Sequence, residues 1–85
     1  MKTIIEENYK SIVKRGLITH KTTKEDFLYK LYEEVNEFED DFLDINCDIA
    51  EELSDIILVC LNIAKHYKID IEKELINKIE INKTR

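Results

Sequence analysis

Eighty-five residues, 44% of them apolar and 38% charged, suffice for one small domain whose core is marginal unless chains associate. A net charge of −6 argues against general affinity for nucleic-acid polymers or anionic membranes, and the longest apolar run, Ile56 to Leu61, is too short to span a membrane. One glycine and no proline leave too few turn signals for a sheet of short strands, so helices are expected.

The first predicted helix runs from about Thr3 to Lys14, because apolar residues recur there at helical spacing and Gly16 follows as a stop. A polar loop, residues 17–22, comes next. The second helix starts at a capping-box pattern, Thr22 with Glu25 three residues later, and continues to about Phe42.

Two further helices follow a short connection at residues 43–47. Asp48 can cap a helix over about Ile49–Tyr67, and Asp70 can cap a last helix that runs towards the end of the chain. No repeat or linker interrupts residues 1–85, so the sequence predicts a single all-α domain, a four-helix bundle.

The two cysteines do not form a disulfide pattern. Cys60 falls inside an apolar helical run, where a small buried thiol is expected, and Cys47 lies in the connection before that helix. The N-terminus turns acidic and polar before any apolar stretch develops, so no signal peptide is expected. A reducing, cytoplasmic location fits these features.

Helical spacing also predicts which faces are buried. The inward stripes are Leu28, Leu31, Val35, Phe38 and Phe42 on the second helix, and Ile49, Leu53, Ile56, Cys60, Ile63 and Tyr67 on the third. Three apolar residues, Val59, Leu61 and Ile76, lie off the main stripes and are expected to need a partner surface. We therefore expect a homodimer or homotetramer.

Acidic pairs flank both stripes. Glu34 and Glu37 lie three apart at the border of the second helix's core, and Glu52 and Asp55 repeat this spacing on the third helix. Lys30 and Asp41 continue the strip of the first pair. Two helices joined by a short loop run antiparallel, so the pairs can face each other at similar height.

Carboxylates that converge in this way repel one another unless a cation neutralises them. An all-oxygen donor set favours Mg²⁺ or Mn²⁺ over zinc. The alternative is that the acids are simply solvated on exposed helix faces, since such pairs are common on helices.

A basic strip is predicted on the last helix. Lys78, Asn82 and Arg85 follow one another at i, i+4 and i+7, beside an apolar strip that includes Leu75 and Ile79. Ammonium and guanidinium groups complement phosphate oxygens, which suits a polyphosphate. The alternative is that cations near a helix C-terminus are favoured by the helix dipole.

The order and spacing of these motifs resemble the all-α nucleoside triphosphate pyrophosphatases of the MazG type. That family has E-E-x-x-E followed by E-x-x-D, here Glu33-Glu34-x-x-Glu37 and Glu52-x-x-Asp55, and then K-x-x-x-N-x-x-R, here Lys78, Asn82 and Arg85. The likeness covers about Gly16 to Arg85, and the first helix only loosely.

The resemblance implies Mg²⁺-dependent hydrolysis of nucleoside or deoxynucleoside triphosphates to monophosphate and pyrophosphate, in nucleotide-pool house-cleaning, with Mn²⁺ as a substitute metal. The catalytic and metal-binding residues would be Glu34, Glu37, Glu52 and Asp55. The phosphates would be contacted by Lys78, Asn82 and Arg85.

Three further residues complete the expected site. Lys30 and Asn62 are candidates for substrate binding, because Lys30 shares the strip of Glu34 and Asn62 continues that of Glu52 and Asp55. Glu33 points away from the core on a helical wheel, so it would support the site from outside the metal ligands or face a partner.

Two kinds of alternative stay open. One is an enzyme of the same fold that acts on phosphoribosyl-ATP or a deoxyuridine nucleotide. The other is a non-catalytic acidic helical bundle that binds a partner helix. A di-iron carboxylate site is disfavoured, because the Glu-x-x-His ligand pairs of such sites are missing.

The chain departs from the family pattern at Lys68, where relatives commonly have a glycine that takes a left-handed backbone. The aromatic residues that line the base pocket of some relatives are not evident near the N-terminus. Phe27, Tyr32 and Tyr67 are the candidates for base stacking, with core packing as the alternative. Both histidines, His20 and His66, are expected at the surface.

Overall fold

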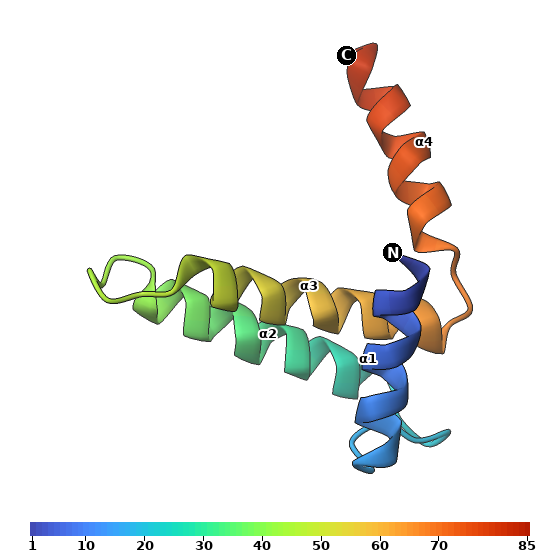
Figure 1. Cartoon of the computed structure of the whole chain (residues 1–85), viewed down its shortest axis with the longest axis horizontal. Helices are drawn as coiled ribbons and strands as arrows, with labels where there is room; N and C mark the ends of the chain where they lie inside the picture. The colour runs from blue at the N-terminus through green and yellow to red at the C-terminus, as the bar shows by residue number, and fades with distance from the viewer.

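The computed structural model describes all residues 1–85 and is entirely helical outside its loops (Figure 1). Helix α1 spans Lys2–Lys14, α2 Lys24–Asp41, α3 Ile49–His66 and α4 Ile71–Lys83. The predicted all-α class and the four predicted helices are therefore confirmed. None of these helices combines the length and the apolar character that crossing a membrane requires.

Helices α2 and α3 form a long antiparallel hairpin, and α1 crosses α3 near the end of the hairpin opposite its loop (Figure 1). Polar contacts tie α1 to α3: Asn8 Nδ2 donates to Asn62 Oδ1 at 2.7 Å, and the Tyr9 hydroxyl is hydrogen-bonded to His66 Nδ1 at 2.8 Å. Helix α4 projects away from this body and has no buried residue. The single chain thus does not form the expected four-helix bundle.

Helix α2 begins one residue later than predicted. Its capping box consists of Thr23 and Asp26: the Asp26 N–H donates to Thr23 Oγ1, and the Thr23 N–H donates to Asp26 Oδ2. The predicted pair, Thr22 and Glu25, has the same spacing, but Thr22 Oγ1 accepts from the N–H of Thr19 at 2.9 Å inside the preceding loop.

The predicted caps of the other two helices are confirmed. The Asp48 carboxylate accepts from the N–H of Glu51 at the start of α3, and the Asp70 carboxylate accepts from the N–H of Lys73 at the start of α4. Each cap satisfies a backbone donor that the first helical turn leaves free.

Two residues have positive φ, and both end a helix: Gly16 at 74° and Lys68 at 58°. After α3, the N–H of Lys68 donates to the Lys65 carbonyl and the N–H of Ile69 donates to the Ala64 carbonyl, which is a Schellman motif. Lys68 therefore adopts the left-handed backbone that the family's glycine position implied.

The buried core lies where α1 crosses the hairpin. Its apolar members are Ile18, Phe27, Val59, Leu61 and Ala64. The prediction that Val59 and Leu61 need a partner surface was wrong, because α1, α2 and α3 bury both within one chain. Ile76, the third member of that set, is exposed on α4.

Much of the predicted inward stripes faces outwards instead. Leu31, Phe38, Ile56 and Ile63 are half-buried, whereas Leu28, Val35, Phe42, Ile49, Leu53, Cys60 and Tyr67 are exposed. Both helices carry an apolar arc wider than one neighbouring helix can cover. The contact within the chain uses the edge of that arc nearest Phe27 and Val59, and leaves the rest uncovered.

His66 also differs from its prediction. It is half-buried and hydrogen-bonded to the Tyr9 hydroxyl. Its ring centroid lies 4.8 Å from that of Phe27, in an edge-on contact. His20 lies exposed in the first loop, as predicted.

Candidate functional site

Glu34 lies deeper between α2 and α3 than predicted. It is only 8% exposed, and Lys30 Nζ lies 2.9 Å from its Oε1. The hydrogen bond to Glu34 raises the pKa of Lys30, so the ammonium stays charged. Glu34 Oε2 is buried and has no hydrogen-bond partner. One half of this carboxylate is therefore neutralised by Lys30, and the other half faces no donor.

Glu52, on the facing side of α3, has a second buried carboxylate oxygen without a partner, Oε2. Burial raises its pKa most, followed by the nearby negative charge of Asp41; the charges of Glu37 and Asp55 add to the effect. The pKa of Glu37 is raised chiefly by the charge of Glu34, then by burial. The acids of α2 and α3 thus act on one another across the groove between these two helices.

This groove is not a finished metal site. No three His, Cys, Asp or Glu side chains are grouped closely enough to hold a metal ion in this structure. The chemistry of the groove nevertheless fits a hard divalent cation: its donors are carboxylate oxygens, and two of them are buried without a partner. A cation bound at either of these oxygens would satisfy it, because a buried acceptor without a partner is costly.

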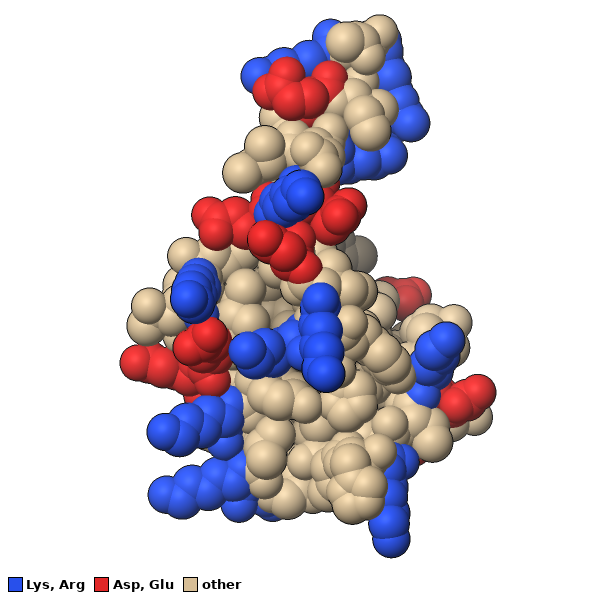
Figure 2. Space-filling view, turned by 90° about the vertical axis from the view of Figure 1, so that its right-hand side faces the viewer, with Lys and Arg blue, Asp and Glu red and all other residues tan.

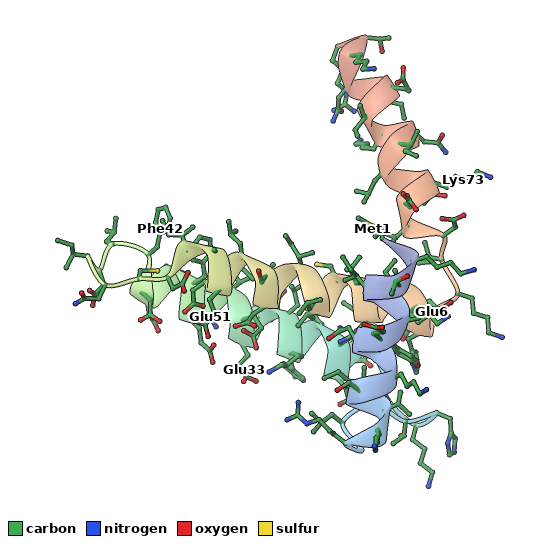
Figure 3. The ribbon with its side chains drawn as sticks, viewed as in Figure 1. Met1, Glu6, Glu33, Phe42, Glu51 and Lys73 are labelled. Atoms are coloured by element: carbon green, nitrogen blue, oxygen red, sulfur yellow. The ribbon has the colours of Figure 1, made fainter.

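Glu33 stands outside the groove, as predicted. Figure 3 shows it pointing away from α3, on the side of the hairpin opposite Phe42. Its only polar contact within the chain is with Lys30, whose Nζ lies 3.4 Å from Glu33 Oε1.

A cavity of about 490 Å³ opens beside the acids, at the junction of α1, α2 and α3. Its wall includes two of the predicted ligands and three other residues named from the sequence: Glu34, Asp55, Lys30, Asn62 and Phe27. A volume of this order is typical of small-molecule sites. The structure therefore places an open cavity next to one half of the acidic set.

Asn62 contributes a polar group to this wall and is itself buried. Asn8 Nδ2 faces the Leu58 carbonyl at 3.5 Å and donates to Asn62 Oδ1. Because a carbonyl oxygen only accepts, this arrangement fixes the Asn8 amide, and the oxygen of Asn62 turns towards it. The Asn62 amide nitrogen has no partner in the chain and remains available as a donor at the cavity.

Of the three aromatic candidates for base stacking, Phe27 alone lines the cavity. It is buried and makes edge contacts with His66 and Tyr67. Tyr32 is exposed on the outer part of α2. Phe27 is thus a wall of the cavity and a core residue at the same time.

The predicted phosphate-binding residues of α4 lie elsewhere. All three are exposed, and none of them lines the cavity of about 490 Å³ or a second cavity of about 320 Å³ near the hairpin loop: Lys78, Asn82 and Arg85. Helix α4 starts at the end of α3 that is far from the hairpin loop, and it leads away from the groove (Figure 1). Within one chain the acidic and basic strips do not meet.

Three residues were missed as site candidates. Asp41 lies close enough to Glu52 to raise its pKa, and its position four residues after Glu37 on the same strip was a usable signal. Asp41 and Glu52 both line the second, smaller cavity of about 320 Å³ near the hairpin loop. Asn8 and Arg15 reach the larger cavity from the first helix and its end. No local pattern could reveal these two, because their contacts are long-range.

Comparison with known protein families, with curated proteins and with solved structures found no match.

Proposed function

We propose that this protein is a Mg²⁺-dependent nucleoside triphosphate pyrophosphohydrolase that removes unwanted or surplus nucleotides. One observation carries the proposal: two buried carboxylate oxygens of the facing helices, Glu34 Oε2 and Glu52 Oε2, lack any partner, and Glu34 also lines the cavity of about 490 Å³. The resemblance of the motifs to MazG-type enzymes supports the same reaction.

In this proposal Glu34, Glu37, Glu52 and Asp55 hold the divalent ion. The bound ion would screen phosphate charge and make a coordinated water more acidic. Mn²⁺ would substitute for Mg²⁺, because it accepts the same oxygen ligands.

The chain's own side chains would bind and orient the nucleotide. Lys30 and Arg15 supply positive charge at the larger cavity for phosphate oxygens, and the free amide N–H groups of Asn62 would donate to an acceptor on the base or sugar. Phe27 would form an apolar wall for the base.

The reaction consumes one water. Its oxygen bonds to the α-phosphorus, the bond from that phosphorus to the bridging oxygen breaks, and pyrophosphate leaves. The proton of the water passes to a carboxylate of the acidic set, and the products are a nucleoside monophosphate and pyrophosphate. Positioning and electrostatic stabilisation are most of what this chemistry requires of a protein.

The test is a screen of ribo- and deoxynucleoside triphosphates, with dUTP and phosphoribosyl-ATP included, for release of pyrophosphate with Mg²⁺ and with EDTA. We expect Mg²⁺-dependent release from at least one of them. Glu52→Gln and Asp55→Asn should lower kcat at least 100-fold, as expected when a catalytic charge is lost. Matched controls are Glu39→Gln and Asp40→Asn, which are exposed outside the groove and should retain activity.

Release of pyrophosphate from none of these substrates would refute the proposal. So would equal activity of Glu52→Gln and Glu39→Gln.

The second candidate function is a non-catalytic module that binds a partner helix. It is favoured by the exposed apolar face of the hairpin, which includes Leu28, Val35, Phe42 and Leu53. Such a module would be indifferent to Mg²⁺, and Glu52→Gln would stabilise it by relieving repulsion.

A further inference from the structure

The larger cavity, of about 490 Å³, has two buried polar side chains in its wall, Glu34 and Asn62. Each is only 8% exposed, whereas every other polar residue of the wall is exposed or half-buried. Glu34 is paired with Lys30 and belongs to the acidic set. The amide oxygen of Asn62 has a partner in the chain but its nitrogen has none, so this donor is left to water or to a ligand. Asn62 is therefore the polar group best placed to recognise a ligand in the cavity.

A second asparagine, Asn8 on α1, sets which end of the Asn62 amide is free. Asn8 Nδ2 lies 3.5 Å from the Leu58 carbonyl oxygen and donates to Asn62 Oδ1 at 2.7 Å. The Leu58 carbonyl can only accept, so the nitrogen of Asn8 stays on this side and engages the oxygen of Asn62. One turn further along α3, the hydrogen bond between the Tyr9 hydroxyl and His66 Nδ1 holds α1 in the same register. The cavity therefore meets the amide donor of Asn62.

The other polar groups near this part of the wall are already engaged as acceptors. Thr22 Oγ1 accepts from the N–H of Thr19, and Asp26 Oδ2 accepts from the N–H of Thr23. Phe27, buried beside them, contributes apolar surface. This part of the cavity thus combines an apolar wall with one free buried donor, which suits a flat ring that carries an acceptor.

The acids lie at the other end of the cavity. Asp55 and Asn62 both line it, and they stand seven residues apart on α3, which is about two turns or about 10 Å. Glu34 and Phe27 have the same separation on α2, and Phe27 contacts the ring of His66 near the end of α3. A nucleotide carries its phosphates and its base on opposite ends of the sugar. With the phosphates at the acids, as in the proposed function, the base reaches Phe27 and Asn62.

The surroundings of this end of the molecule favour an anionic ligand. Figure 2 views the molecule from the end opposite the hairpin loop, and Lys and Arg side chains are spread around that end. Residues 1–30, which contain α1, the first loop and the start of α2, hold seven Lys and Arg and four Asp and Glu. A positive surround of this kind attracts negatively charged ligands. Both Arg15 and Lys30 line the cavity itself.

We propose that Asn62, oriented by Asn8, selects nucleotides whose base has a carbonyl oxygen at the position where cytosine and adenine have an amino group. Uracil, thymine, guanine and hypoxanthine belong to this class. Their carbonyl oxygen accepts from Asn62 Nδ2, whereas the amino group of cytosine or adenine brings a second donor against it and leaves both without a partner. This selection rests on the proposed function for the position of the phosphates and adds the class of base to it.

The first test compares kcat/KM for pyrophosphate release with Mg²⁺ within two pairs of substrates, dUTP with dCTP and ITP with ATP. The carbonyl-bearing member of each pair should be favoured roughly 10- to 100-fold, the range expected for one unpaired buried donor. Equal values within both pairs would overturn the selection.

The second test reverses the preference through Asn8. In Asn8→Asp the introduced carboxylate only accepts, so the Asn62 amide should turn to donate to it and present its oxygen to the cavity. The variant should then favour dCTP over dUTP, a reversal that a merely structural role of Asn8 would not produce. Asn36→Asp, which adds the same charge at an exposed position of α2, should keep the wild-type preference.

A second variant covers the case in which Asn8→Asp does not fold, as judged by circular dichroism. Asn8→Ala removes the group that orients the Asn62 amide, so the ratio of kcat/KM for dUTP to that for dCTP should fall towards one. A wild-type ratio in either folded Asn8 variant would show that Asn8 does not set the selection.

Binding of the monophosphates dUMP and dCMP, without Mg²⁺, separates this inference from the proposed function. Nuclear magnetic resonance of the Asn62 side-chain amide should show dUMP binding with a dissociation constant at least tenfold lower than that of dCMP. If the protein releases pyrophosphate but treats both pairs of substrates alike, the selection is wrong and the proposed function stands. If it releases pyrophosphate from no nucleotide, the proposed function fails; tighter binding of dUMP would still support the role of Asn62, and equal or absent binding would overturn it.

Discussion

Replacing Lys68 with glycine should stabilise the protein. Lys68 is exposed and holds φ at 58°, which costs an L-residue roughly 1–2 kcal/mol relative to glycine. Glycine also lowers the stability by roughly 0.5–1 kcal/mol, because it gives the unfolded chain more conformational freedom to lose on folding. We expect Lys68→Gly to raise the free energy of unfolding by about 0.5–1 kcal/mol, or the melting temperature by about 2–8 °C for a chain of this size.

Urea and thermal unfolding followed by circular dichroism would measure this effect. All variants must be compared at one protein concentration, because association raises apparent stability. The matched control is Gly16→Ala. Gly16 has φ at 74°, and an added Cβ there meets no atom within 4 Å, so the variant carries the backbone cost without a clash. It should lower stability by about 1 kcal/mol.

Opposite signs for the two substitutions are the expected result. If Lys68→Gly is neutral or destabilising while Gly16→Ala destabilises, then the left-handed strain does not govern this turn. In that case the Lys68 side chain would have to make a stabilising contact that outweighs the strain.

Two further predictions concern the groove and the core. Burial raises the pKa of Glu52, and the charge of Glu34 raises that of Glu37, so the folded protein binds these protons more tightly than the unfolded chain. In the absence of divalent ions, these two glutamates should destabilise the folded state increasingly as the pH rises from the ordinary glutamate pKa of 4.5 through the raised values. The urea midpoint of Glu52→Gln should then rise relative to that of wild type as the pH increases. A difference in midpoint that does not change with pH would contradict this. Phe27→Ala should lower the free energy of unfolding by about 3 kcal/mol, because Phe27 is buried. Phe42 is exposed, so Phe42→Ala should lower it by less than about 1 kcal/mol at concentrations where the chain is monomeric. Equal losses for the two variants in urea unfolding would mean that the inward face of α2 is the one that the sequence predicted.

Local signals predicted the helices well. Asp48 and Asp70 were identifiable as caps because each stands just before a helical pattern, and Gly16 was identifiable as a stop. The start of α2 was ambiguous by one residue, since Thr22 with Glu25 and Thr23 with Asp26 offer the same spacing. Only the loop hydrogen bond between Thr22 and Thr19 decides between them.

The orientation of the helices was harder to predict. A helical wheel gives the apolar arc but not which part of it meets a helix of the same chain, so Cys60 was expected inside and Leu61 outside, and both are reversed. On α2, the orientation likewise differs from the prediction, because Glu34 was expected at the border of the core and is buried. The cavity depends on α1, whose position across α3 is set by long-range contacts such as that of Asn8 with Asn62.

The Lys30 ammonium is a counter-ion for the buried Glu34 carboxylate and comes from the same helix. In the proposed function, a divalent ion would contact the partnerless Oε2 of Glu34 while the ammonium stays 2.9 Å from Oε1, so the two cations would share one carboxylate. Lys30 also lines the adjoining cavity, where its ammonium would complement the phosphates of the proposed substrate. The divalent ion and the nucleotide would each tighten the binding of the other, because thermodynamic linkage between two sites is reciprocal.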